Sequence, residues 1–175
     1  MTGRQYYDWL TEGGVNDVTR MVSVMERLGV PWCMIGGLAV NHWAQEPMVT
    51  RDVDIVIALD QVEPVVEAFA QAGFKVNRFP YSINLDGGSQ VFIQISTDEM
   101  YRTFPVNGVP ADIHGILMRV ASLEDTLKGK LAAWGDKGRR ASKRQKDLAD
   151  IARLVEAHPD LESKIPAEVL ARIRD

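Results

Sequence analysis

The chain has 175 residues, 46% of them hydrophobic and 25% charged, with a formal net charge of −4. This composition fits one or two small globular domains that bury about 70% of the unfolded surface, and the net negative charge argues against a nucleic-acid binder that uses its whole surface. The single cysteine, Cys33, excludes a disulfide framework and a thiolate zinc cluster. The start MTGRQYYDWL has no secretion pattern, and no apolar run reaches the ~18 residues of a membrane helix. We therefore expect a cytoplasmic protein without a membrane segment.

The first third of the chain predicts a helix, a strand and a second helix in close succession. Residues 15–29, VNDVTRMVSVMERLG, carry apolar side chains at helical spacing and end at Gly29, which suits a left-handed C-cap. PWCMI, residues 31–35, is typical of a short buried strand that stops at Gly36 and Gly37. LAVNHWA, residues 38–44, follows as a short helix without a linker.

The middle of the chain predicts a strand over residues 51–59 and a helix over 60–74 with Asp60 as N-cap. Four further short strands are expected, separated by turn-prone residues, over residues 74–79, 81–85, 90–96 and 109–115.

From Ser122 onward the pattern is helical. Ser122 with Asp125, and Ser142 with Gln145, are typical of two capping boxes, and Pro166 opens a last helix. The predicted fold class is α/β (α+β): a mixed β-sheet core with flanking helices over residues 1–118, followed by a C-terminal helical region over residues 119–175.

Two carboxylates interrupt the predicted strand RDVDIVIAL. Asp52 and Asp54 share one face because side chains alternate along a strand. At a separation of about 6.6 Å and an effective dielectric near 20, they repel by roughly 2.5 kcal/mol, so a cation should offset them. Mg²⁺ takes carboxylate and phosphate oxygens and fits this spacing. The alternative is an exposed edge strand whose aspartates face water or pair with Arg51.

The preceding Gly36–Gly37 turn has a related explanation. Residues without a Cβ at a strand-to-helix junction let a phosphate approach the backbone, where the first N–H groups of the helix supply hydrogen bonds and partial positive charge. An ordinary tight turn is the alternative for this dipeptide alone. Fourteen residues then lead to Asp-Val-Asp, which would bring a phosphate site beside a metal site.

At these residues, MIGGLAV and RDVDIVI, the sequence resembles the nucleotidyltransferase superfamily of the DNA polymerase beta type. It is most similar there to small bacterial members related to abortive-infection nucleotidyltransferase toxins, which add a helical part with a Lys-Asp-x-x-Asp stretch, here KDLAD. The resemblance implies that Gly36 and Gly37 hold nucleotide phosphates and that Asp52 and Asp54 ligate two Mg²⁺ ions. Leu38 follows the glycines where many relatives have a hydroxyl.

The resemblance also implies a third carboxylate, which we assign to Asp112 in VPADIHG as a metal ligand and catalytic base, on a strand beside RDVDIVI. A turn aspartate near Gly115 is the alternative. Asp98 and Glu99, in the polar run STDEMY, are the rivals for the third carboxylate.

A basic segment, GDKGRRASKRQKD, holds six cations that oppose the dipole of the helix they precede, so a phosphate partner would explain them. A solvated loop is the alternative. We assign Arg51, Lys130 and Lys146 to nucleotide binding, and Arg140 and Lys143 to the acceptor. For Arg51 a plain surface role is an equal alternative, and Lys146 is also spaced for an i,i+4 ion pair with Asp150. Trp43 and Trp134 are expected to pack in a core.

The sequence thus predicts a Mg²⁺-dependent enzyme that moves a nucleoside monophosphate from an NTP to a hydroxyl of an acceptor: a tRNA end, another RNA, a protein or a small molecule. The metals would neutralise triphosphate charge and lower the pKa of the attacking hydroxyl. A cognate antitoxin is a possible partner. The alternatives are a non-catalytic binding protein of the same fold, as half of a toxin–antitoxin pair or a nucleotide sensor, and a metal-dependent phosphatase or nuclease.

Overall fold

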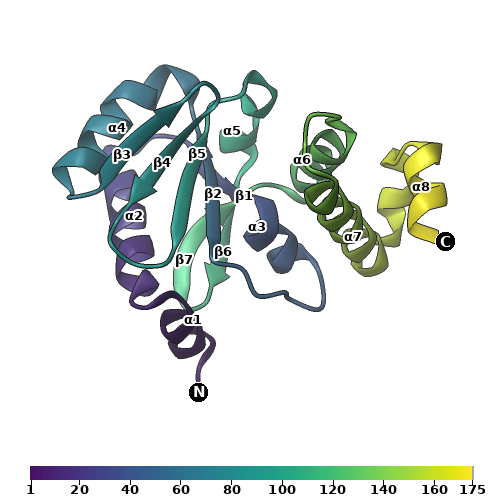
Figure 1. Cartoon of the computed structure of the whole chain (residues 1–175), viewed down its shortest axis with the longest axis horizontal. Coiled ribbons are helices and arrows are strands. Elements are labelled where there is room, and N and C mark those ends of the chain that lie inside the picture. The colour runs from purple at the N-terminus through teal and green to yellow at the C-terminus, as the bar shows by residue number, and fades with distance from the viewer. Residues whose placement is uncertain (175) are drawn as a thin grey trace.

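The structure, a computed structural model, describes residues 1–174 and contains a mixed β-sheet with helices around it (Figure 1). The helices are α1 (Gly3–Thr11), α2 (Gly14–Leu28), α3 (Gly36–Trp43), α4 (Val62–Gln71), α5 (Phe104–Asn107), α6 (Leu123–Gly135), α7 (Ala141–Ala157) and α8 (Ala167–Arg174). The strands are β1 (Trp32–Ile35), β2 (Asp52–Ile57), β3 (Lys75–Phe79), β4 (Ser82–Asp86), β5 (Phe92–Ser96), β6 (Val109–Ile113) and β7 (Ile116–Val120). Short 3₁₀ helices span Leu59–Gln61, Glu99–Tyr101 and Pro159–Lys164.

The seven strands form one sheet in the order β3-β4-β5-β2-β1-β7-β6. The β2–β5 and β1–β7 pairs are parallel and the remaining pairs antiparallel. The predicted mixed α/β class is confirmed. All four residues of β1 are buried, as expected for a strand at the centre of a sheet that is covered on both faces.

The two faces of β2 have opposite chemistry. Val53, Ile55 and Ile57 are buried in the main hydrophobic core, which lies between the sheet and the helices α2 and α4. Each such side chain contributes about 1.5–3 kcal/mol through burial. Asp52 and Asp54 point the other way by alternation and are only half-buried. The apolar face therefore fixes the strand register, and with it the direction of the carboxylate pair.

The C-terminal helices build a second hydrophobic cluster. Val40 of α3 packs there with Leu127 of α6 and Ile151 of α7, and Trp43 and Trp134 pack against the cluster as predicted. The indole nitrogen Nε1 of Trp43 donates a hydrogen bond to the carbonyl of Ala121 (3.0 Å). Leu38 and Ala39, which directly precede Val40 in α3, belong to the main core. Helix α3 is therefore shared by the two clusters.

Figure 1 shows α6 and α7 beside α3, away from the β3–β4 edge of the sheet. The change from strands to helices falls between the end of β7 at Val120 and the start of α6 at Leu123. No helix within residues 1–174 combines the length and the apolar character that crossing a membrane requires.

Local predictions had mixed outcomes. The Ser122 cap is confirmed, because its side chain accepts a hydrogen bond from the Asp125 amide. The Asp60 cap is wrong: Asp60 lies within a 3₁₀ turn, and the N-cap of α4 is Gln61. The Ser142 cap is also wrong, because α7 begins at Ala141, two residues earlier than that cap implies, and its N-cap Arg140 makes no side-chain cap hydrogen bond.

Helices α1 and α5 and strand β7 have no counterpart in the sequence prediction. Helix α1 is fixed by a capping box between Thr2 and Gln5. Strand β7 continues the β6 hairpin after a turn in which Gly115 and His114 both have positive φ.

Candidate active site

Asp52 and Asp54 line a cleft between the sheet and the C-terminal helices. The sheet contributes the two carboxylates together with polar side chains of β5. The helical side contributes basic side chains of α6, α7 and the segment that joins them. The residues that line the cleft are Ile35, Gly36, Gly37, Thr50, Asp52, Asp54, Gln94, Ser96, Tyr101, Phe104, Asp125, Thr126, Gly129, Lys130, Ala133, Arg139, Lys143, Lys146 and Asp147.

Gly36 sits where only glycine fits. Its φ is +72°, and a Cβ at this position would lie 2.6 Å from Oδ2 of Asp54. A side chain would therefore strain the backbone and displace the carboxylate. The strand-to-helix junction and the carboxylate pair depend on each other, as the spacing of the two motifs suggested.

Gly37 lies in the first turn of α3, which begins directly after β1 and has no side-chain cap. The first N–H groups of such a helix remain available to an anion. A Cβ on Gly37 would lie 3.7 Å from the Thr50 methyl carbon and 3.9 Å from Nζ of Lys146. An ammonium group and a helix N-terminus thus converge beside Asp54, in an arrangement that suits phosphate.

The carboxylate pair is electrostatically strained. Burial, followed by the charge of Asp52, raises the pKa of Asp54 from 3.8 to about 6, while Lys130, Lys146 and Arg139 act in the opposite direction. The cations of the cleft therefore do not fully offset the combined effect of burial and of the Asp52 charge on the pKa of Asp54. A pair of adjacent carboxylates, one of which has a raised pKa, fits a divalent cation, since Mg²⁺ binds one or two carboxylates plus phosphate oxygens.

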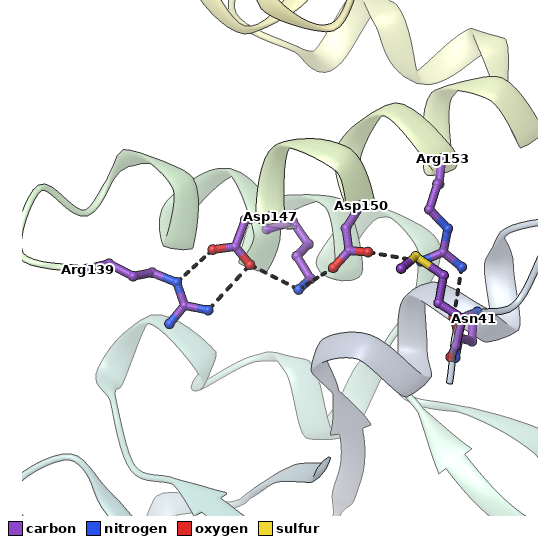
Figure 2. A network of polar contacts seen from close by, with 7 residues as sticks. Asn41, Arg139, Asp147, Asp150 and Arg153 are labelled. Atoms are coloured by element: carbon purple, nitrogen blue, oxygen red, sulfur yellow. Dashed lines mark hydrogen bonds and ion pairs between the residues drawn. The ribbon is translucent and has the colours of Figure 1, made fainter. Parts of the chain in front are cut away.

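The helical wall is held by a buried ion-pair network (Figure 2). Nζ of Lys130 lies 3.1 Å from Oδ1 of Asp147 and 2.8 Å from Oδ2 of Asp150. Nε of Arg139 lies 2.6 Å from Oδ2 of Asp147. Both aspartates are 1% exposed, so they hold these cations in place at the cleft while partly neutralising them.

The same network reaches the segment that precedes β2. Arg153 contacts Asp150 (2.9 Å), the side-chain oxygen of Asn41 on α3 (2.8 Å) and the carbonyl of Glu46 (2.7 Å). The Asn41 amide in turn bonds both the N–H and the carbonyl of Met48. The helical wall is therefore tied to the connector that leads to Asp52, as Figure 2 shows for Asp150, Arg153 and Asn41.

Seven of the residues predicted for the site come together in this cleft. They come from β2, the β1–α3 junction, α6 and α7, namely Gly36, Gly37, Asp52, Asp54, Lys130, Lys143 and Lys146. Two predicted cations lie outside it. Arg51 is exposed and bonds the Gln90 side chain, and Arg140 is exposed at the N-terminus of α7. The predicted Lys146–Asp150 ion pair is wrong, because Asp150 pairs with Lys130 and Arg153 instead.

The expectation that the strand of Asp112 lies beside β2 is also wrong. In the sheet, β6 is an edge strand and pairs only with β7, whereas β2 lies between β5 and β1. Asp112 is exposed, and its Oδ1 accepts a hydrogen bond from the Gly115 amide (2.7 Å), so it shapes the β6–β7 turn.

The two rivals of Asp112 lie outside the cleft as well. Asp98 caps the 3₁₀ turn Glu99–Tyr101, and Glu99 pairs with Arg102. Within residues 1–174 there is no group of three or more His, Cys, Asp or Glu side chains placed to hold a metal ion.

The sequence prediction did not assign Asp147, Asp150, Arg139 or Gln94 to the site. A signal for the aspartates was present. Along α7 they occupy the core-facing stripe that continues through Ile151 and Leu154, where an acidic side chain needs a buried partner. No local pattern identifies Gln94, because its place in the cleft depends on the pairing of β5 with β2.

Known structures share this fold. The lincosamide antibiotic adenylyltransferase LnuA, bound to lincomycin, aligns with a TM-score of 0.54 at 13% identity, over 79% of this chain and 96% of its own. ANT(2")-Ia in complex with adenylyl-2"-tobramycin aligns with a TM-score of 0.60 at 13% identity, over 92% and 97%. A nucleotidyltransferase-like protein of Paracoccidioides brasiliensis gives 0.52 at 20% identity, over 85% and 89%.

A sequence search among curated proteins finds no match. A family model described as nucleotidyl transferase AbiEii toxin, type IV toxin–antitoxin system, matches residues 24–175, which include the glycine turn, the carboxylate pair and the basic wall. The fold and the family agree with the resemblance that the two motifs suggested. The chain belongs to the AbiEii nucleotidyltransferase toxin family.

Proposed function

We propose that this nucleotidyltransferase transfers a nucleoside monophosphate from an NTP to a hydroxyl group of an acceptor, with Mg²⁺ held by Asp52 and Asp54. The observation that carries the proposal is the convergence in one cleft of a carboxylate pair, a glycine turn at a helix N-terminus and four basic side chains (Lys130, Arg139, Lys143 and Lys146). Each part suits a different portion of a metal–triphosphate.

In this reaction the acceptor oxygen forms a bond to the α-phosphorus, and the bond from that phosphorus to the bridging oxygen of the β-phosphate breaks. Pyrophosphate leaves with the electron pair, and the acceptor hydroxyl loses its proton to a base or to water. The bound metal, expected as two ions, would neutralise phosphate charge and lower the pKa of the attacking hydroxyl.

The chain's own residues orient the nucleotide. Gly36 and Gly37 present backbone to the phosphates without a side chain in the way. Lys130 and Lys146 offset the charge of the departing pyrophosphate, and the buried aspartates keep Lys130 in position before substrate arrives. Lys143 also lines the cleft, so we assign it to the triphosphate.

For the acceptor we propose only a chemical class, which is RNA, protein or a small molecule that carries a hydroxyl group. Arg140 is exposed outside the cleft and remains the candidate contact for a large anionic acceptor. Family membership supports a role as the toxin of a toxin–antitoxin pair, with a cognate antitoxin as functional partner. The intact carboxylate pair disfavours a non-catalytic binding protein, since the cations of the cleft only partly counter the effect of burial and of the Asp52 charge on Asp54.

The test is to incubate the protein with each α-labelled NTP, Mg²⁺ and cell extract, and to ask which molecule becomes labelled. We expect one class of acceptor to carry the label in the wild type and none to carry it with Asp54→Asn. Labelling that is equal in both proteins, or absent from both, would contradict the proposal. The matched control is Asp60→Asn, which changes an exposed carboxylate outside the cleft.

A further inference from the structure

The cleft has two chemically different sides. The basic side chains Lys130, Arg139 and Lys146 all lie on the helical side, together with the glycine turn that follows β1. On the other flank of β2, strand β5 contributes Gln94 and Ser96. Among the described residues that line the cleft, none from β5 is charged.

This asymmetry sets the direction of transfer. Attacking and leaving oxygens lie roughly in line, on opposite sides of the phosphorus. The cations and the glycine turn suit the departing pyrophosphate on the helical side. The acceptor hydroxyl must therefore arrive from the opposite side, over β5.

Gln94 is the β5 residue that lies directly beside Asp54 in the sheet. It is the register partner of Asp54 across the parallel β2–β5 pair, where strands lie about 4.8 Å apart. The two side chains share the cleft face, and Gln94 is half-buried there. The residue beside Asp54 on this flank is thus a neutral amide.

The Gln94 amide is held from behind. Its Nε2 donates a hydrogen bond to Oδ1 of Asn84 (2.9 Å), the register partner of Gln94 on β4. Its carbonyl oxygen Oε1 has no hydrogen-bond partner among residues 1–174. A fixed amide with an unused acceptor oxygen is suited to receive an O–H or N–H donor.

We propose that Gln94 binds the acceptor substrate, with Oε1 accepting a hydrogen bond from the hydroxyl that is to be modified or from a donor beside it. Asn84 is a positioning residue that acts through Gln94. The inference rests on the proposed function and adds to it the side from which the acceptor enters. It also requires that the acceptor present a hydrogen-bond donor at the reacting group, and that β5 contribute no charge to the metal site.

The sheet supplies a matched control. Asn77 on β3 continues the same register row beyond Asn84, yet it is exposed and does not line the cleft. An amide can therefore be replaced by leucine at three positions of one row, Asn77, Asn84 and Gln94, at increasing proximity to Asp54.

The experiment measures initial rates of labelling from the α-labelled NTP that the wild type uses, first against increasing cell extract and then against increasing NTP. For Gln94→Leu we expect about a tenfold higher half-saturating extract concentration or a tenfold lower rate, from the loss of one hydrogen bond. The half-saturating NTP concentration and Mg²⁺-dependent NTP binding by calorimetry should stay within twofold of the wild type.

The Asn84 variants separate positioning from folding. Asn84→Leu should reproduce part of the Gln94→Leu defect. Asn84→Asp should transfer at the wild-type rate, because its carboxylate still accepts the hydrogen bond from Nε2 of Gln94. Asn77→Leu should have no effect on transfer. Gln94→Glu should tighten Mn²⁺ or Mg²⁺ binding in calorimetry, because it places a third carboxylate in register with Asp54.

Two outcomes would overturn the inference. One is that labelling by Gln94→Leu depends on the extract concentration as it does in the wild type. The other is that Gln94→Leu loses NTP binding in parallel with transfer, which would mean that Gln94 contacts the nucleotide and not the acceptor. Either result leaves the proposed function standing, because that function is tested by wild-type labelling and its loss in Asp54→Asn.

Discussion

The cleft has a floor, formed by strand β2 with Asp52 and Asp54, and a helical wall, formed by α6 and α7 with Asp147 and Asp150, and the carboxylates of the two differ in their partners. On the floor, Asp52 and Asp54 have no basic side chain within ion-pair distance among residues 1–174. In the wall, Asp147 and Asp150 each have two cationic partners. The charges of the wall aspartates are thus balanced by neighbouring side chains, whereas those of the floor aspartates are available to a bound cation. Replacing a carboxylate of the floor should therefore reduce transfer activity without reducing the free energy of unfolding. Replacing a carboxylate of the wall should chiefly reduce the free energy of unfolding.

The largest expected effect comes from breaking the floor. Asp54→Asn removes one of the two metal ligands, so transfer should fall by about 10³-fold, corresponding to several kcal/mol of lost charge stabilisation. Mg²⁺ should no longer strengthen NTP binding in a calorimetric titration, while the circular dichroism spectrum stays that of the wild type. Full activity in this variant would assign the pair a structural role.

Breaking the wall should unfold the protein more easily. Asp150→Ala leaves Lys130 and Arg153 without a shared buried partner, so we expect the free energy of unfolding to fall by about 3 kcal/mol in urea denaturation. Glu99→Ala is the control. Its ion pair with Arg102 is exposed, and the loss should be at most about 1 kcal/mol. Equal losses in the two variants would remove the contrast between wall and surface.

The contrast also has a pH signature in the metal-free protein. Because the pKa of Asp54 is about 6 in the folded chain and near 3.8 when unfolded, the folded state holds a proton between these values that the unfolded state has lost. The contribution of Asp54 to stability therefore declines as pH rises through this window, by up to about 3 kcal/mol above pH 6.

In EDTA, Asp54→Asn should match the wild type near pH 4 and be more stable than the wild type at pH 7.5. Urea denaturation at the two pH values measures the difference. A gap between the two proteins that is the same at both pH values would mean that the pKa of Asp54 is not raised.

The smallest effect concerns the rim of the cleft. If the acceptor is RNA, Arg140→Ala should weaken its binding only severalfold at moderate salt and reduce the slope of log affinity against log salt by about one. Fluorescence anisotropy with a labelled RNA over a salt series would measure this slope. An unchanged slope would mean that Arg140 does not contact the RNA and is only a solvated surface residue.

The parts of the site that local pattern could predict are those where one short segment carries the whole signal. Asp52 and Asp54 are set by strand alternation, and Gly36 by a strand-to-helix junction. Which strands are neighbours is a property of the whole chain. Alternation could therefore place Asp112 on one face of a strand, but it could not show that this strand is three positions from β2 in the sheet.

The same limit explains why Gln94 was not identified. It lies beside Asp54 because a parallel pairing joins two strands separated by a helix and a hairpin, and nothing in QVFIQIS by itself indicates that pairing. Lys143 and Lys146 were easier to find, since they belong to a basic segment whose charge conflicts with the helix dipole. The buried aspartates Asp147 and Asp150 required the burial pattern of α7 to be considered together with its charge.

The position of α3 has a consequence for how the molecule opens and closes. Leu38 and Ala39 anchor this helix in one hydrophobic cluster, Val40 anchors it in the other, and its first turn faces the proposed phosphate site. Neither half can melt without exposing apolar surface of α3, so amide hydrogens of this helix should exchange only in the globally unfolded state. A bound nucleotide would then slow hydrogen exchange in α2 and α7 alike, although these helices belong to different clusters.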